Sequence, residues 1–155
     1  MDMCQLERTM IEIKEVATRA QRRAFLNFPL KLYKRNDCFV PPLYADEKKL
    51  FRKNYHYYDT SEAVYYLAFR GKEVVGRISG ILQKASNEKW HQKRVRFTRF
   101  DCIDDREAAA ALFSAVEQWA RAKGMEEVVG PLGFSDLERE GLLIEGFDEL
   151  STFEE

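Results

Sequence analysis

The amino-acid sequence predicts an α/β domain in which a mixed, mostly antiparallel central sheet has helices on both faces. Three consecutive segments rich in β-branched and aromatic residues, 63–70, 74–83 and 95–103, are typical of neighbouring strands. A strongly amphipathic helical pattern follows the third of them, and a short apolar segment, 125–129, comes next. A strand–helix–strand crossover of this kind places the last strand parallel to the strand before the helix.

The N-terminal region is predicted to form a strand and then a helix. Residues 9–16 have the apolar content of a short strand, and residues 18–34 have one apolar helical face. That face repeats every four positions, at Ala20, Ala24, Phe28 and Leu32. Pro29 lies inside the helical pattern, so we expect a kink or a break there. Residues 36–61 are predicted to be irregular, with one or two helical turns at 46–53.

The three middle strands are predicted to form a meander. Gly71 begins a tight reversal between the first two strands, whereas residues 84–94 are charged and are expected to form an exposed loop. In the third strand the apolar residues change parity between Phe97 and Phe100. An extra residue at Thr98 or Arg99, which is a β-bulge, would explain this change. The alternative is that a short strand simply ends there.

The crossover helix has recognisable start and stop signals. Asp104 or Asp105 is suited to cap its first turn, and Gly124 suits the left-handed position after its end. The strand at 125–129 is expected to be central in the sheet. In the glycine-rich tail that follows, Ser135 and Glu138 resemble a capping box that would open a short helix, with one more strand after it.

Composition limits the classes of function. The chain has 155 residues, enough for one domain, and its net charge of -1 argues against a nucleic-acid partner. No apolar run approaches the length of a membrane span, and the N-terminus lacks an apolar signal core, so we expect a cytoplasmic location. Cys4, Cys38 and Cys102 are too far apart to predict a disulfide framework or a metal site. His56 and His91 likewise have no partner at ligand spacing.

Four sequence stretches resemble one protein family. They are Phe39-Val40-Pro41-Pro42-Leu43, Val75-Gly76-Arg77-Ile78-Ser79-Gly80, Gly130-Pro131-Leu132-Gly133 and Gly141-Leu142-Leu143-Ile144-Glu145-Gly146-Phe147-Asp148. Together they resemble the bacterial ceramide-synthase-like branch of the acyl-CoA N-acyltransferase (GNAT) superfamily. Members of this branch are usually longer, with a second GNAT-like half. The resemblance therefore implies that residues 1–155 form a single GNAT-like domain, the N-terminal half of a longer protein, with its C-terminal part incomplete.

The resemblance also implies a reaction and a site. The reaction is acyl transfer from acyl-CoA, without a metal, to an amine that is small or lipid-like, such as a long-chain amine of sphingoid type. In this fold the thioester lies where the bulged strand and the next strand separate, here at residues 99–102 and 127–130. The implied cofactor-binding residues are Arg99, Phe100, Asp101, Cys102 and Arg106. The candidate catalytic residues are Asp101, Glu127 and Tyr65, with Glu126 as a further possible base.

The expected pyrophosphate loop departs from the family pattern. The usual spaced glycines before the crossover helix are absent, and Asp104, Asp105 and Glu107 stand at the helix start instead. A carboxylate cap uses the same backbone N–H groups that a phosphate would use, and it repels a phosphate. This departure favours an alternative function, a non-catalytic GNAT-like half-domain that needs a second half or a partner.

Two further features concern partners. The first helix and the residues after it carry a run of basic residues without an acidic one: Arg19, Arg22, Arg23, Lys31, Lys34 and Arg35. This face is either solvated or in peripheral contact with an anionic membrane. Near Gly141 to Phe153 we expect an unpaired sheet edge or an exposed apolar patch, which would favour a homodimer.

Overall fold

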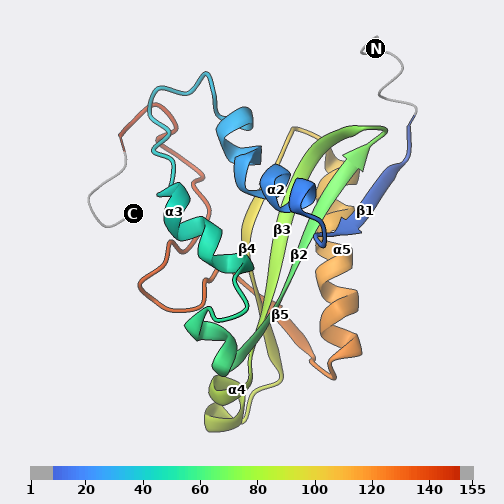
Figure 1. The fold of residues 1–155 in the computed structure, drawn as a ribbon, viewed down its shortest axis with the longest axis vertical. Coiled ribbons are helices and arrows are strands. Elements are labelled where there is room, and N and C mark those ends of the chain that lie inside the picture. The colour runs from blue at the N-terminus through green and yellow to red at the C-terminus, as the bar shows by residue number, and fades with distance from the viewer. Residues whose placement is uncertain (1–8, 151–155) are drawn as a thin grey trace.

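A computed structural model describes residues 9–150, and Figure 1 shows its fold. The strands are β1 (Ile11–Glu15), β2 (Ser61–Arg70), β3 (Glu73–Gln83), β4 (Arg94–Cys102) and β5 (Glu127–Val129). The helices are α2 (Arg19–Leu32), α3 (Tyr44–Glu47), α4 (Lys84–Trp90) and α5 (Arg106–Ala122), with 3-10 turns η1 (Lys48–Phe51) and η2 (His56–Asp59).

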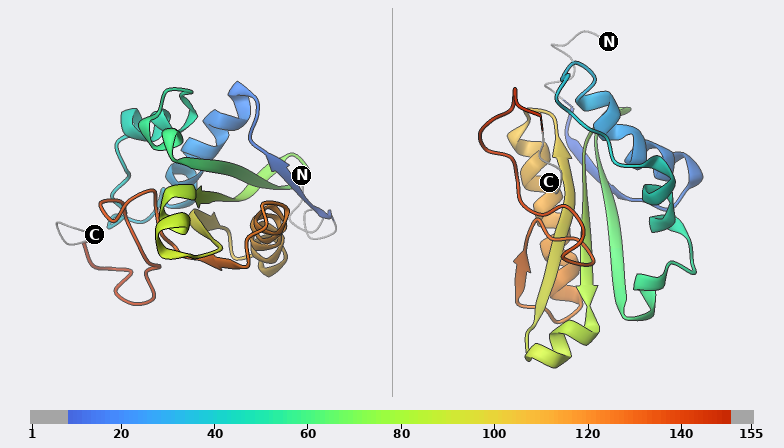
Figure 2. Two further views of the ribbon diagram at one scale, coloured as in Figure 1. Left: turned by 90° about the horizontal axis from the view of Figure 1, so that it is seen from below. Right: turned by 90° about the vertical axis from the view of Figure 1, so that its left-hand side faces the viewer.

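The sheet has the predicted topology. Its strand order is β1-β2-β3-β4-β5, and all neighbours are antiparallel except β4 and β5, which are parallel. Helix α5 covers one face, while α2, α3 and the two 3-10 turns form a layer on the other face (Figure 2). The predicted α/β class, with a mostly antiparallel sheet between two helical layers, is confirmed.

Each face of the sheet has its own apolar core. On the α5 side, Leu112 and Val116 of the helix pack against Ile78 and Val95 of the sheet. On the α2 side, the ring of Phe25 makes edge-to-face contacts with the rings of Tyr65 and Phe51. The sheet is therefore buried on both faces, which explains why β3 is a nearly continuous run of buried residues.

The predicted bulge in β4 is confirmed. Thr98 pairs with Ser79 and Asp101 pairs with Arg77, so two residues of β4 face Ile78 alone. Arg99 has a φ of 50°, in the left-handed region. The extra residue resets the alternation of the strand, and four side chains consequently point to the α5 face: Val95, Phe97, Phe100 and Cys102.

Helix α2 begins at Arg19, after the N-cap Thr18, and continues through Pro29. Thr18 and Gln21 form a capping box, and of the kink or break expected at Pro29 the break is absent. Because proline has no N–H, the carbonyl oxygen of Phe25, four residues earlier, lacks its helical donor. Arg77 Nη1 of β3 donates to that oxygen at 2.8 Å. A buried arginine of the sheet thus replaces the missing helical hydrogen bond.

Two local expectations about loops and helices are wrong. Residues 84–90 form helix α4 rather than a loop, and they end in a left-handed residue, His91, with Gln92 N donating to Asn87 O. Residues 135–138 form a turn rather than a helix. There Ser135 Oγ accepts from Leu137 N, and the Glu138 carboxylate accepts from Phe134 N instead of closing a capping box.

The C-terminal part of the sheet also differs from the prediction. Strand β5 is at the edge of the five-stranded sheet rather than central, because residues 131–150 contain no further strand. Within these residues an exposed apolar patch is present, as predicted for residues 141–153, of which 151–153 lie outside the described part of the chain. The patch consists of Leu142, Leu143, Ile144, Phe147 and Leu150. Of the helices in residues 9–150, none has the length and apolar content needed to span a membrane.

Candidate functional site

Strands β4 and β5 separate soon after they pair. Arg94, Val95 and Arg96 pair with the three residues of β5, and β4 then continues to Cys102 without a partner in β5. Beyond β5, Leu132 N donates to Phe97 O at 2.9 Å, after which the chain passes to the α2 side. The parallel pair therefore opens toward the bulge at Arg99, where the sequence predicted the opening.

The opening exposes backbone donors of β4. Ile103 N donates to Val75 O of β3, so the N–H of Ile103 faces β3. Because backbone groups alternate along a strand, the N–H groups of Cys102 and Phe100 face the other way, toward the opening. Phe100 itself packs against Phe113 of α5, with ring centroids 4.7 Å apart. One wall of the opening is thus aromatic, and β4 supplies hydrogen-bond donors.

The start of α5 next to this opening is filled by the protein's own carboxylates. Asp105 is the N-cap and accepts from Glu107 N at 3.0 Å and from Ala108 N at 3.1 Å. Arg70 of β2 forms ion pairs with Asp105 at 2.7 Å and with Glu107 at 2.9 Å. Burial opposes the ionisation of Asp105, but these partners outweigh it and hold its pKa below the usual value. Two backbone donors of the first turn, Glu107 N and Ala108 N, are therefore already used, whereas Arg106 is exposed.

Asp101 is the centre of a hydrogen-bonded network on the α2 face. Its Oδ1 accepts from Tyr33 Oη at 2.9 Å, and its Oδ2 accepts from Arg77 Nε at 2.7 Å. Burial, with the Asp101 charge beside it, raises the pKa of Tyr33. Both carboxylate oxygens have a partner, so this side chain joins α2, β3 and β4. A role for Asp101 as a base stays a prediction.

Arg99 lies on the same face and is also engaged. Its guanidinium contacts both Glu47 oxygens at 3.0 Å and lies 3.7 Å from Glu138. Burial acts to lower the pKa of Arg99, but the Glu47 carboxylate outweighs it and the pKa is raised. The bulge residue thus ties β4 to α3 and to the C-terminal tail. Binding of a cofactor by Arg99 stays a prediction.

The other two catalytic candidates have partners other than Asp101. Tyr65 is buried, its hydroxyl lies 2.7 Å from Tyr58 Oη, and burial raises its pKa well above the ordinary value. Glu127 forms an exposed ion pair with Arg94, at the end where β4 and β5 are paired. Asp101 is seven positions further along β4 than Arg94, about 20 Å at the usual rise per residue. Glu127 and Asp101 therefore cannot act on one atom together.

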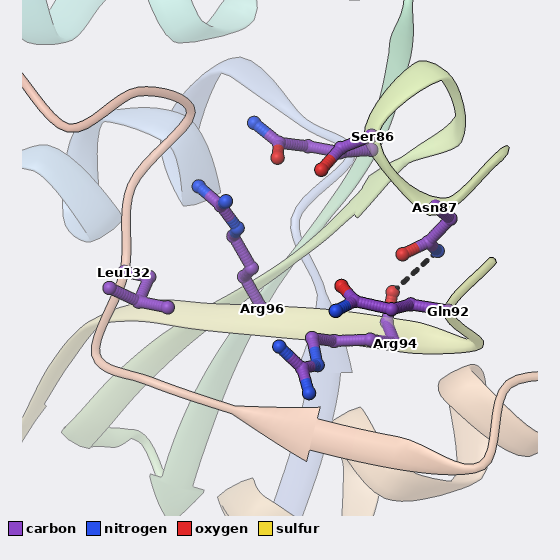
Figure 3. Close-up of a pocket in the computed structure, with 7 residues that line it drawn as sticks. Ser86, Asn87, Gln92, Arg94, Arg96 and Leu132 are labelled. Atoms are coloured by element: carbon purple, nitrogen blue, oxygen red, sulfur yellow. Dashed lines mark hydrogen bonds between the residues drawn. The ribbon is translucent and has the colours of Figure 1, made fainter. Parts of the chain in front are cut away.

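Near the paired end of β4 and β5 a small polar pocket is present (Figure 3). Its volume is about 40 Å³, and its lining residues are Gln83, Ser86, Asn87, Gln92, Arg94, Arg96 and Leu132. Asn87 Nδ2 donates to Arg94 O at 2.8 Å, and Arg96 Nη1 donates to Gly133 O at 3.1 Å. This volume holds a water molecule or two but no acyl chain. In residues 9–150 no group of three metal-ligating side chains is present.

Sequence reasoning missed three residues of the site region: Tyr33, Glu47 and Arg77. Arg77 is almost fully buried in β3. It donates hydrogen bonds to the Asp101 carboxylate and to the Phe25 carbonyl of α2. One signal in the sequence could have indicated it. A proline inside a helix leaves a carbonyl without a donor, and an arginine in an otherwise apolar strand is suited to supply one.

The thiol of Cys102 allows a test of the opening's electrostatics. Burial, followed by the Asp105 and Asp101 charges, raises the pKa of Cys102 to about 11. At pH 8 its thiolate fraction should then be roughly a hundredfold lower than that of an ordinary cysteine. We expect iodoacetamide to modify Cys102 at least tenfold more slowly in the native chain than in urea, in a variant with Cys4→Ser and Cys38→Ser. Equal rates at pH 8 would contradict the described environment.

Two curated bacterial proteins are similar in sequence, whereas no protein-family model matches the chain. Protein YghO of Escherichia coli K12 is 33% identical over 129 residues, which are 81% of this chain and 32% of that protein. The bacterial ceramide synthase of Caulobacter vibrioides NA1000 is 31% identical over 140 residues, 89% of this chain and 36% of that protein. The chain spans about a third of the length of these relatives.

Solved structures identify the fold. A tandem GNAT protein from the clavulanic acid biosynthesis pathway has a TM-score of 0.56 at 15% identity, over 73% of this chain and 34% of that one. FeeM, an N-acyl amino acid synthase from uncultured soil microbes, has a TM-score of 0.54 at 14% identity, over 79% and 75%. An acetyltransferase from Streptococcus agalactiae has a TM-score of 0.51 at 18% identity, over 76% and 70%. With its bulged β4 and the opening between β4 and β5, the chain therefore has the GNAT fold.

Proposed function

We propose that this chain forms the acyl-CoA site of an acyltransferase that acylates an amine. The observation that carries this proposal is the opening between β4 and β5, into which β4 turns backbone N–H groups beside the bulge at Arg99. Fixed N–H donors stabilise the oxyanion that forms when a thioester carbonyl is attacked. The opening is lined on the α5 side by Phe100 and Phe113, which suit an apolar acyl chain.

In the proposed reaction the amine nitrogen attacks the thioester carbonyl carbon, and a C–N bond forms. The carbon–sulfur bond breaks as the tetrahedral intermediate collapses, and the sulfur leaves as the CoA thiolate. The nitrogen of the neutral amine loses one proton after it has attacked, and that proton ends on the thiolate, directly or through water. Tyr65 is buried and its pKa is raised well above the ordinary value, so it keeps its proton and no proton transfer is assigned to it.

We propose a long-chain amine as the acceptor. Support comes from the 31% identity to a protein named bacterial ceramide synthase, which extends over most of this chain. The exposed leucines and the phenylalanine of residues 141–150 supply apolar surface on the side of the molecule to which the tail passes. The acyl donor is acyl-CoA, and the chemistry needs no metal.

A non-catalytic role is the second candidate, and one observation favours it. Glu107 N and Ala108 N at the start of α5 donate to Asp105 and are not free to donate to a phosphate, and the Glu107 carboxylate adds a second negative charge there. A chain that cannot hold the pyrophosphate would contribute structure to a larger acyltransferase without binding CoA itself.

Titration calorimetry and a thiol-release assay test the proposal. With palmitoyl-CoA and a long-chain amine such as sphinganine, we expect micromolar binding and amine-dependent release of CoA thiol. The variant Asp105→Asn with Glu107→Gln keeps an oxygen cap but removes two charges, and it should bind palmitoyl-CoA roughly fivefold more tightly.

Glu117→Gln with Glu126→Gln removes two exposed charges away from the start of α5 and serves as the matched control. Its affinity for palmitoyl-CoA should equal that of the unmodified chain. Absence of binding by the unmodified chain and by both variants would reject the catalytic role in favour of the second candidate.

A further inference from the structure

The charge of this protein is distributed unevenly. Residues 19–53 contain ten lysines and arginines but three acidic residues, a net charge of +7 in a chain whose total is -1. These residues form α2, α3, η1 and their connections, which lie together in the layer opposite α5 (Figure 2). We call this layer, residues 19–53, the basic layer. Positive charges thus greatly outnumber negative ones within the basic layer.

Helix α2 turns its basic residues outward. Its buried residues, Phe25, Leu26, Phe28 and Pro29, define the face that packs on the sheet. At 100° per residue, Arg23 and Lys31 lie on the opposite face, and Arg19 lies on its flank. All three are exposed, and Leu30 between them is 42% exposed. The outer face of α2 is therefore basic with an apolar residue among the charges.

Few of these charges are neutralised within the protein. Among the basic residues of the basic layer, only Lys31 and Lys49 form ion pairs within the described residues, with Glu73 at 3.9 Å and with Asp46 at 2.6 Å. The other eight basic residues are exposed and have no acidic partner there: Arg19, Arg22, Arg23, Lys34, Arg35, Lys48, Arg52 and Lys53. Such an unbalanced patch attracts anionic surfaces within about a Debye length.

The same layer also exposes apolar side chains. Leu43 is 74% exposed, Val40 is 48% exposed and Tyr44 is 42% exposed, all in or beside the connection from α2 to α3. A nucleic acid would leave these side chains in water, because its accessible surface is mostly charged backbone. A lipid headgroup region buries them while its phosphates meet the basic residues.

We propose that the basic layer docks this protein on an anionic lipid bilayer, with Leu43 and its neighbours inserted among the headgroups. Exposed lysine and arginine side chains on both sides of that segment contact the lipid phosphates. This docking does not depend on acyl transfer, and a protein without enzymatic activity would show it equally.

Co-sedimentation of the full chain with vesicles tests the proposal. Binding is expected to vesicles of 30% phosphatidylserine in phosphatidylcholine, and at least tenfold weaker binding to phosphatidylcholine alone. Each basic residue near an anionic surface contributes up to about fivefold in affinity. The variant Arg19→Gln, Arg23→Gln, Lys34→Gln and Arg35→Gln should therefore lose at least tenfold, and Leu43→Ser should lose several-fold on the same vesicles.

A matched control removes four exposed basic residues outside the basic layer, by Lys84→Gln, Lys89→Gln, Lys93→Gln and Arg121→Gln. This control has the same net charge as the first variant and should keep its vesicle binding. Equal losses in both quadruple variants would overturn the proposal, since binding would then follow total charge. Unchanged binding of Leu43→Ser, together with equal affinity for a short DNA duplex, would also overturn it and indicate a general polyanion site.

Discussion

Replacement of Arg77 by methionine is expected to lower the free energy of unfolding by about 3–5 kcal/mol, the usual cost of removing one partner of a buried ion pair. The guanidinium is almost fully buried, pairs with Asp101 and donates to the Phe25 carbonyl that Pro29 leaves without a helical donor. Methionine restores most of the volume but neither interaction. Two buried acceptors, one of them charged, would then lack their main donor.

Urea denaturation followed by circular dichroism measures this loss. Arg121→Met is the matched control, because Arg121 pairs with Glu117 on the exposed face of α5 and should cost less than 1 kcal/mol. Arg77→Met combined with Asp101→Leu should be less destabilised than Arg77→Met alone, because the unpaired carboxylate is gone. A loss below 1 kcal/mol for Arg77→Met would contradict the network described around Asp101.

The sequence predicted those elements whose patterns are local and repeated. The meander of β2, β3 and β4 followed from strand composition and the turn at Gly71, and α5 followed from its apolar stripe and a cap at Asp104 or Asp105, of which Asp105 is the N-cap. The bulge at Arg99 was also predictable, because an extra residue shifts the parity of every apolar side chain after it.

The missed features depend on contacts between distant segments or on an unusual local residue. Helix α4 ends on His91 in a left-handed conformation that glycine normally takes, so its stop signal was not recognised. Pro29 did not break α2 because Arg77, 48 positions later, supplies the missing donor. The pairing of Glu47 with Arg99, which fixes the bulge to α3, likewise has no local signature.

Replacement of Arg99 by methionine is the second change expected to have a large effect, a loss of about 3 kcal/mol in the free energy of unfolding. Its guanidinium binds both oxygens of Glu47, and the side chains of both residues are 14% exposed. Its second partner, Glu138, accepts from Phe134 N and so holds the first turn of the tail. We therefore expect faster hydrogen exchange in α3 and in residues 131–140 as well.

Two matched variants separate the contribution of the ion pair to stability from that of the backbone conformation at Arg99. Arg94→Met removes a similar two-nitrogen contact with Glu127 on the same strand, but this pair is exposed and should cost less than 1 kcal/mol. Arg99→Gly removes the pair but suits the left-handed backbone at φ 50°, so it should be about 1 kcal/mol less damaging than Arg99→Ala. If Arg99→Met and Arg94→Met cost the same, or hydrogen exchange in residues 131–140 is unchanged, Arg99 does not tie the bulge to the tail.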